Sequence, residues 1–102
     1  MAEYTTVSWR DIPAQIIVRA GRKRARRELS KRFMVAVDKC AMVTGADETD
    51  AYLAEWRRST PTPCEDDIEQ IADQLAEKAE AEYTNERLRL LVDAGGFENH
   101  DE

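Results

Sequence analysis

Histidine, cysteine and long apolar runs are scarce in this chain of 102 residues. The single histidine, His100, lies near the end in a segment expected to be flexible, where it cannot act as a positioned catalytic base. The two cysteines, Cys40 and Cys64, stand far apart and outside any CxxC pattern, which favours reduced thiols over a disulfide or a zinc site. These scarcities argue against histidine-dependent nucleophilic catalysis, and we expect no metal and no cofactor.

The hydrophobic content predicts one modest core and no membrane span. No apolar run approaches the ~20 residues needed to cross a bilayer, and the N-terminus lacks the basic region and apolar core of a secretory signal. A composition of 42% hydrophobic and 35% charged residues is typical of a soluble domain of this size. We therefore expect a cytoplasmic protein with a single domain over residues 1–97, followed by a flexible acidic tail at residues 98–102.

Charge is divided unevenly along the chain. Residues 1–58 contain twelve Lys/Arg and eight Asp/Glu, a net charge of +4, whereas residues 59–102 contain three and thirteen, a net charge of −10, which sums to the −6 of the whole chain. The charged residues of such halves can lie in solvent on the surface or face each other across the fold. Alternatively, the basic block can bind an anionic partner. The sequence pI of about 4.9 favours a protein partner, because nucleic-acid-binding domains are usually basic.

Two short segments near the N-terminus predict a β-hairpin. Thr5, Val7 and Trp9 alternate with polar residues, and Ile16, Val18 and Ala20 would share one face of a second strand. Asp11-Ile12-Pro13 supplies a turn between them. Because a two-stranded unit is marginal in water, helices must cover one face or another chain must extend its edge.

Ser30 is the best start for the first helix. A helix running back to Arg22 would place Arg22 and Arg26 on the apolar face, so residues 22–29 are predicted to form a connector or a third extended segment. From Ser30, the helix would end at Gly45 and bury the stripe Phe33, Ala36, Val37, Cys40 and Ala41.

Three further helices are predicted in the acidic half and just before it. Asp47 can cap a helix through about Arg58, whose core side would carry Tyr52, Leu53 and Trp56. Thr62, Pro63 and Glu65 resemble a capping box, which would place Cys64 at the start of a long helix with the stripe Ile68, Ile71, Ala72, Leu75 and Ala79. This alanine-rich stripe suits close packing on another helix, within the chain or across a homodimer.

Thr84 or Asn85 can cap a last helix bearing Leu88, Leu91 and Val92, which ends at Gly95-Gly96. The fold class is therefore α+β, with an N-terminal β-hairpin packed against three or four α-helices.

Aromatic residues followed by arginine mark candidate binding positions. Trp9-Arg10 and Trp56-Arg57 are such pairs, because a guanidinium group can stack on an indole ring. An open hairpin edge would add main-chain pairing with a partner. The hypothesis is a non-enzymatic protein-interaction or accessory protein, without catalytic residues, whose partner-binding residues are Trp9, Arg10, Arg19, Arg22, Lys23, Arg24, Arg26, Arg27 and Arg57.

Two alternatives from other classes stay open. A nucleic-acid-binding module would use the basic segment at residues 22–32 as phosphate contacts, namely Arg22, Lys23, Arg24, Arg26, Arg27, Lys31 and Arg32, and would show strongly salt-dependent affinity. An enzyme would use Asp11, Asp38 or the carboxylates of residues 65–67 with an arginine as anion clamp. The second alternative requires a pocket where these groups converge and a carboxyl group with a raised pKa.

Three strings of the sequence carry a family resemblance: VSWRDIPAQIIVRAGRK, KRFMVAVDKCAM and TDAYLAEWRRS. Over about residues 7–59, with a weaker match near residues 88–97, the chain resembles small bacterial proteins grouped under the name "virulence factor" domain. Members of this group are often encoded beside one-carbon and cobalamin-dependent methyl-transfer enzymes in alpha-proteobacteria, so the resemblance implies an accessory role. It assigns no catalytic residue to this chain.

Overall fold

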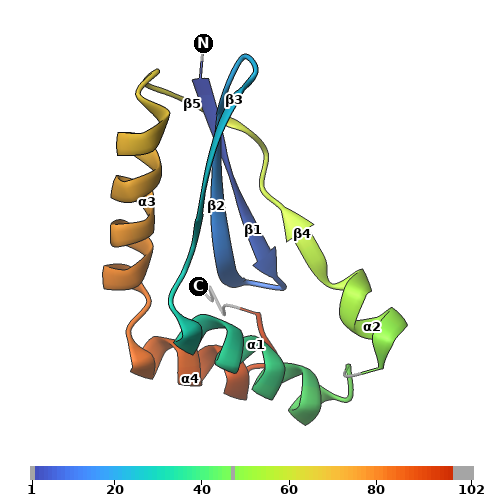
Figure 1. Cartoon of the computed structure of the whole chain (residues 1–102). Helices are drawn as coiled ribbons and strands as arrows, with labels where there is room; N and C mark the ends of the chain where they lie inside the picture. Colours follow the sequence, from blue (N-terminus) through green and yellow to red (C-terminus); the bar gives the residue numbers. More distant parts are fainter. Residues whose placement is uncertain (1, 47, 98–102) are drawn as a thin grey trace, which may run out of the picture.

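The computed structural model describes residues 2–46 and 48–97, which form a five-stranded antiparallel sheet and four helices. Figure 1 shows α3 beside the sheet, with α1 and α4 packed together at one end of it. The predicted α+β class, with an N-terminal hairpin and helices, is confirmed. The cap predicted at Asp47 and the tail predicted at residues 98–102 lie outside the described residues.

The predicted hairpin consists of β1 (Ala2–Trp9) and β2 (Ile12–Ala20). Alternation has the expected effect, since Val7, Trp9, Ile16 and Val18 are buried. The turn is tighter than predicted: it contains Arg10, with a φ of 54°, and Asp11, while Ile12 and Pro13 already belong to β2. The pairing register between β1 and β2 shifts between Val7 and Ser8, next to Pro13. Pro13 precedes Gln15, the first residue of β2 that pairs with β3, so the backbone N–H that proline lacks is not needed for that pairing.

Both outer edges of the hairpin are occupied by further strands. The segment at residues 22–29 is the third extended segment, because β3 (Lys23–Glu28) pairs with β2. On the other side, β4 (Trp56–Arg58) and β5 (Thr62–Cys64) pair with opposite ends of β1. The hairpin edge that we expected to offer to a partner is therefore covered by this chain.

These two short strands correct the helix predictions around them. Helix α2 spans only Thr49–Ala54, because Trp56 lies opposite Trp9 in the sheet instead of on a helix. Tyr52 and Trp56 are half-buried as expected, but Leu53 is 58% exposed. The capping box at Thr62 is also wrong: this segment pairs with β1, and Cys64 lies in a strand and not at a helix start.

Helices α1 (Lys31–Thr44) and α4 (Asn85–Asp93) follow the predictions closely. The buried stripe of α1 contains the five predicted residues, and Gly45 ends it in a left-handed conformation with a φ of 79°. At the start of α4, the Thr84 hydroxyl accepts a hydrogen bond from the backbone N–H of Arg87, and Leu88, Leu91 and Val92 are buried. Sequence signals that act within one or two turns therefore located these helices well.

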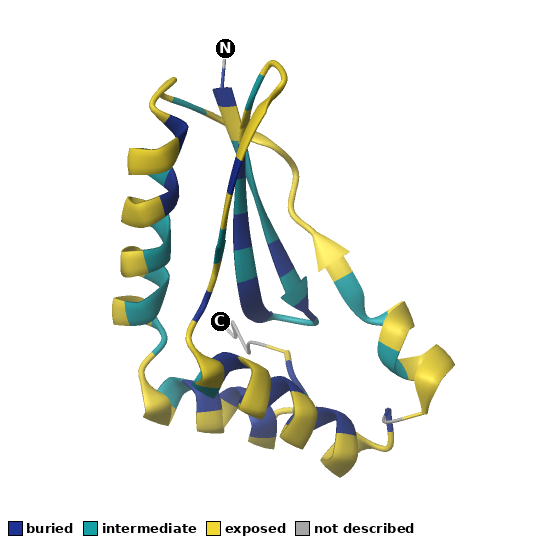
Figure 2. Cartoon of the chain, in the orientation of Figure 1, coloured by how far each residue is buried: buried dark blue, intermediate teal, exposed yellow. Residues whose placement is uncertain are grey.

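Helix α3 (Ile68–Glu82) packs on the sheet. The sequence had predicted that it would pack on another helix. Its cap is Asp67, whose carboxylate accepts a hydrogen bond from the backbone N–H of Gln70. Ile68 and Ala72 are buried against β2 and β3, and the small Ala72 side chain allows a close approach. Figure 2 shows the sheet-facing side of α3 buried or half-buried and its outer side exposed.

The core extends from α3, along one face of the sheet, to α1 and α4 at the turn end of the hairpin. Its largest fully buried side chains come from the hairpin and from α1: Trp9, Ile12, Val18, Phe33, Val37 and Cys40. Trp9 also donates a hydrogen bond from Nε1 to the backbone oxygen of Tyr52, at 2.9 Å. One sheet face is thus packed on α3, and the opposite face carries the exposed side chains considered next.

Candidate binding surface

Strand β3 separates its arginines between two faces. Ala25 is buried on the face that packs on α3, and Arg27 lies on the same face two residues later. The Arg27 guanidinium contacts two carboxylates of α3, with Nη2 at 2.6 Å from Glu69 Oε1 and Nε at 2.7 Å from Asp73 Oδ1. Hydrogen bonds to Glu69, then to Asp73, raise the pKa of Arg27. Arg27 therefore joins the basic and acidic halves of the chain within the fold.

Arg24 and Arg26 point to the opposite, solvent-exposed face. The antiparallel register places Arg24 directly opposite Arg19 of β2, and Arg26 opposite Ile17. All three arginines are exposed, and within residues 2–46 and 48–97 none has a hydrogen bond or ion pair from its side chain. We call Arg19, Arg24 and Arg26 the arginine face. Like charges directly opposite each other destabilise a strand pair, so the pairing of Arg19 with Arg24 is unfavourable for the fold itself.

The turn between β2 and β3 supplies two further cations. Arg22 lies in the turn and Lys23 begins β3 opposite Ala20, and both are exposed. Alternation puts Lys23 on the side of Ala25 and Arg27, facing the start of α3. Arg22 and Lys23 are thus close to the arginine face in sequence, but Lys23 does not share it.

We expect the adjacent residues Arg26 and Arg27 to differ in their effect on stability. Arg27→Ala should lower the melting temperature measurably, because it removes the two ion pairs to α3, whereas Arg26→Ala should leave it unchanged. Thermal unfolding of both variants at low and high salt tests this difference. Equal melting temperatures for the two variants would contradict the internal role of Arg27.

Trp9 and Arg10 make their contacts within the fold and are not on the predicted binding surface. Trp9 is fully buried, so its side chain belongs to the core. The Arg10 side chain is 15% exposed, with Nε at 3.2 Å from Glu55 Oε1, and its Nη1 donates a hydrogen bond to the backbone oxygen of Gly95 at 2.6 Å. Its guanidinium carbon lies 4.9 Å from the centre of the Trp9 ring. The stacking expected for this pair is present, but it is internal.

Arg57 takes part in the same arrangement from β4. The Phe97 ring lies 5.1 Å from the guanidinium carbon of Arg10 and 5.4 Å from that of Arg57. Two cations, one from the turn after β1 and one from β4, thus contact one aromatic ring near the end of the described chain. The sequence indicated Gly95-Gly96 only as a helix end and gave no sign of this contact.

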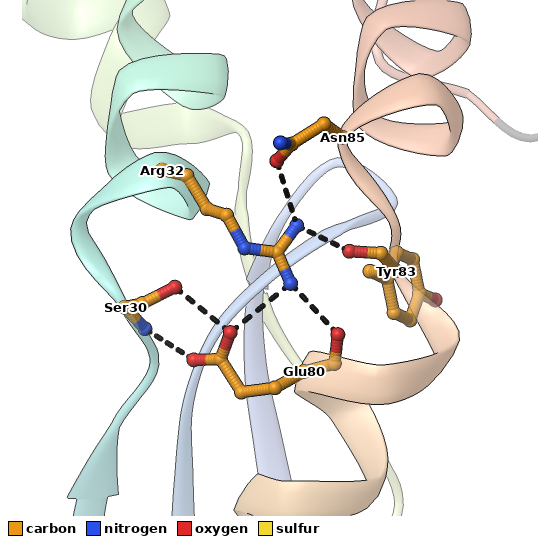
Figure 3. A network of polar contacts seen from close by, with 5 residues as sticks. All are labelled: Ser30, Arg32, Glu80, Tyr83 and Asn85. Carbon is orange, nitrogen blue, oxygen red and sulfur yellow. Dashed lines mark hydrogen bonds and ion pairs between the residues drawn. The ribbon is translucent and has the colours of Figure 1, made fainter.

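Arg32 connects the start of α1 to the junction between α3 and α4 (Figure 3). Its Nη2 donates to the backbone oxygen of Glu80 at 2.7 Å and to Glu80 Oε1 at 3.1 Å. Its Nη1 donates to the backbone oxygen of Tyr83 and to Asn85 Oδ1. Arg32 is therefore engaged within the fold, which removes it from the phosphate contacts of the nucleic-acid alternative.

Glu80 is the centre of this network. Its carboxylate accepts hydrogen bonds from the backbone N–H of Ser30 at 2.6 Å and from the Ser30 hydroxyl at 2.8 Å. Desolvation acts to raise the pKa of Glu80, but the hydrogen bonds from Ser30 and Arg32 outweigh it and lower the pKa. Ser30 precedes α1 as predicted, but its hydroxyl binds Glu80 and makes no capping bond to α1.

The carboxylates of the enzyme alternative are dispersed over the fold. Asp11 lies in the turn between β1 and β2, and Asp38 is exposed on α1. Residues 65–67 lie between β5 and α3, at the other end of the sheet (Figure 1). In the part of the chain that the structure describes, no group of three or more His, Cys, Asp or Glu side chains could hold a metal ion. These positions do not assemble into one site.

Both thiols have a raised pKa. Burial raises the pKa of Cys40, with a smaller opposing effect of Arg10. Desolvation raises the pKa of Cys64 as well, and Asp66, Glu3 and Glu65 act in the same direction. A thiol that is harder to ionise is a poorer nucleophile at neutral pH.

The fold and the surface define a small α+β protein with one helix-covered sheet face and one exposed, arginine-bearing face. A family model described as "Virulence factor" matches residues 7–92, and the chain belongs to this family. The search of curated proteins and the search of solved structures gave no match. Among the described residues, every helix is too short or too polar to cross a membrane.

Proposed function

We propose that the protein is a non-enzymatic accessory protein of the cytoplasm that binds an acidic surface of a protein partner through the arginine face. The observation that carries this proposal is the gathering of Arg19, Arg24 and Arg26 on one exposed sheet face without internal ion pairs. The resemblance of the sequence strings extends the proposal to a role beside one-carbon or cobalamin-dependent methyl-transfer enzymes.

The chemistry of the face suits carboxylates. Guanidinium groups bind carboxylates through two parallel hydrogen bonds, and the sheet fixes the spacing of the three backbone positions that carry them. Half-buried Ile17 lies opposite Arg26, two residues before Arg19 on β2, and can contact an apolar group of the partner. Glu3, opposite Arg19 on β1, sets an acidic border. Such a charge pattern contributes to the rate of association and to the choice of partner.

A nucleic-acid partner fits the same face less well. Open antiparallel sheets that bind single strands use aromatic side chains on which bases stack. The sheet neighbours of the arginine face on its own side are Glu3, Thr5, Gln15, Ile17 and Glu28, none of which is aromatic. Two of the seven predicted phosphate contacts, Arg27 and Arg32, are already bound to carboxylates of α3.

Replacing Arg24 and Arg26 together by alanine should reduce partner binding by about ten-fold or more, because two charged contacts are lost. The matched control is Lys31→Ala with Lys78→Ala, which removes the same charge from two exposed positions away from the face. Affinity purification of each tagged variant from the native host, at two salt concentrations, measures the recovered protein and nucleic acid.

Each outcome has a distinct meaning. A defined protein that the control retains and the arginine variant loses supports the proposal. Nuclease-sensitive, salt-labile nucleic acid as the sole bound material would replace it with the nucleic-acid module. Equal recovery of the same protein by both variants would overturn the assignment to the arginine face.

A further inference from the structure

Helix α1 carries a second apolar stripe that faces away from the core. Val35, Met42 and Val43 are 48%, 71% and 69% exposed, and their spacing places them along one side of the helix. A helix on the surface of a globular protein normally has one apolar face, which packs on the core. The five buried residues already provide that face of α1. The second stripe has the character of a surface that contacts another molecule.

A groove runs between this stripe and α4. The two helices lie side by side and run in the same direction (Figure 1). Arg32 meets Asn85 at their starts, and a Cβ built on Gly95 would lie 3.7 Å from Thr44 Cγ2 at their ends. The groove encloses about 570 Å³, and its lining includes Val35, Lys39 and Val43 of α1 and Leu88, Arg89 and Asp93 of α4.

The groove has an apolar floor and a cation in the middle of each wall. Buried Ala36, Leu88 and Val92 form the floor. Lys39 lies midway along the α1 wall and Arg89 midway along the α4 wall, and both are exposed. In the described part of the chain, neither forms an ion pair. An apolar ligand with carboxylates on both of its flanks would complement these walls.

The direction of the two helices adds a second element of complementarity. Because α1 and α4 run parallel, the positive ends of their dipoles coincide near Asn85, and the negative ends coincide near Val43. A third helix placed antiparallel to both would set its own negative end at the Asn85 end of the groove. Helical α1 is about 21 Å long, so about 14 residues of a partner helix would fill the groove.

We propose that the groove between α1 and α4 binds an amphipathic, acidic helix of another protein, antiparallel to both helices. The apolar stripe of that helix packs on Val35, Val43 and the floor, and its flanking carboxylates pair with Lys39 and Arg89. This surface is separate from the arginine face, and the proposal does not depend on the function proposed above.

A second copy of this chain suits the groove less well. In a two-fold symmetric pairing of two grooves, Lys39 and Arg89 would lie close to the same cations of the other copy. Like charges at an interface without intervening carboxylates oppose association. Charge complementarity therefore favours a different, acidic protein.

Two synthetic helical peptides of about 15 residues test the proposal. Both carry the same leucine stripe, flanked by glutamates in one and by lysines in the other. Titration into isotope-labelled protein, followed by NMR, should show the glutamate peptide binding at the amides of α1 and α4, about ten-fold more tightly than the lysine peptide. Lys39→Glu with Arg89→Glu should reverse this preference, whereas Lys31→Glu with Lys78→Glu, at exposed positions outside the groove, should preserve it.

A spin label on the peptide tests the orientation. A label at the N-terminal end of the glutamate peptide should broaden the amides of Val43 and Asp93, and one at the C-terminal end those of Arg32 and Asn85. Equal affinity for both peptides, perturbation centred outside the groove, or the reverse broadening pattern would overturn the proposal. Sedimentation that shows a dimer abolished by Val43→Glu would assign the groove to a second copy instead.

Discussion

Gly96→Ala should lower the free energy of unfolding by about 3 kcal/mol or more, because an alanine at this position is strained in its backbone and too close to its neighbours. The Gly96 φ is 90°, a conformation that residues with a Cβ rarely adopt. A Cβ at this position would lie 2.9 Å from Arg10 Cδ and 3.1 Å from Cys40 Sγ. Arg10 is held by Glu55 and by the Gly95 carbonyl, and Cys40 lies in the core, so neither atom can move away cheaply.

Gly45→Ala provides the matched control for Gly96. Gly45 also has a left-handed φ, of 79°, but a Cβ there meets no atom within 4 Å. Its cost should be limited to about 1–2 kcal/mol of backbone strain. Urea unfolding of both variants measures the difference. Equal losses would show that Arg10 and Cys40 yield easily and that Gly96 is needed only for its backbone conformation.

The effect expected at Gly96 comes from contacts between distant parts of the chain. The backbone N–H of Asp11 donates to the Gly96 oxygen at 2.8 Å, which joins the end of α4 to the first turn of the sheet. The sequence identified Gly95-Gly96 as a helix end, because glycine in that role is a local signal. The packing of Gly96 against Arg10 and Cys40 has no local signal and could not be predicted.

The same contrast explains which elements were predicted correctly. The buried stripe of α1 follows from a period of 3.6 residues and from terminal signals at Ser30 and Gly45, all within a few turns. The segment around Thr62 has a good local helix signal, yet it forms β5. The outer edge of β1 offers unpaired backbone groups, and pairing with them outweighs local preference. The same competition converts Trp56 from a predicted helical residue into a strand residue.

The basic segment could have been divided further from its sequence alone. Ala25 is the one apolar residue in β3, so a period of two assigns Arg27 to the covered face and Arg24 and Arg26 to the exposed one. The partners of Arg27 were not accessible in this way, because Glu69 and Asp73 lie more than 40 residues away and α3 was expected to pack on a helix. That Arg19, Arg24 and Arg26 bind a partner stays a prediction.

Two separate cationic surfaces, one on the sheet and one between two helices, give the accessory hypothesis its physical content. The arginine face suits carboxylates on a folded partner, and the groove between α1 and α4 suits an amphipathic helix. A partner that presents both features would bind with greater affinity than either contact alone provides, if its geometry allows both at once. The paired variants described for each surface separate these contributions.

Glu80→Ala should lower the free energy of unfolding by about 2 kcal/mol, the second large effect expected in this molecule. The substitution removes the acceptor for both Ser30 groups and one of the acceptors for Arg32. The Arg32 guanidinium would keep only its backbone acceptors and Asn85. Glu77→Ala, at an exposed position one turn earlier on α3, is the matched control and should change stability little.

The contribution of Glu80 should also depend on pH, with a sign fixed by its lowered pKa. A carboxyl group whose pKa is lower in the folded than in the unfolded state stabilises the fold fully above its unfolded value, here 4.5. That stabilisation is lost as the pH falls from there through the folded pKa. Glu80→Gln should therefore be less stable than the natural protein at about pH 7, and the difference should shrink towards about pH 3. Urea unfolding of both proteins at a series of pH values measures this difference in unfolding free energy. A difference that stays constant from about pH 7 to about pH 3 would show that the negative charge of Glu80 contributes nothing to the network.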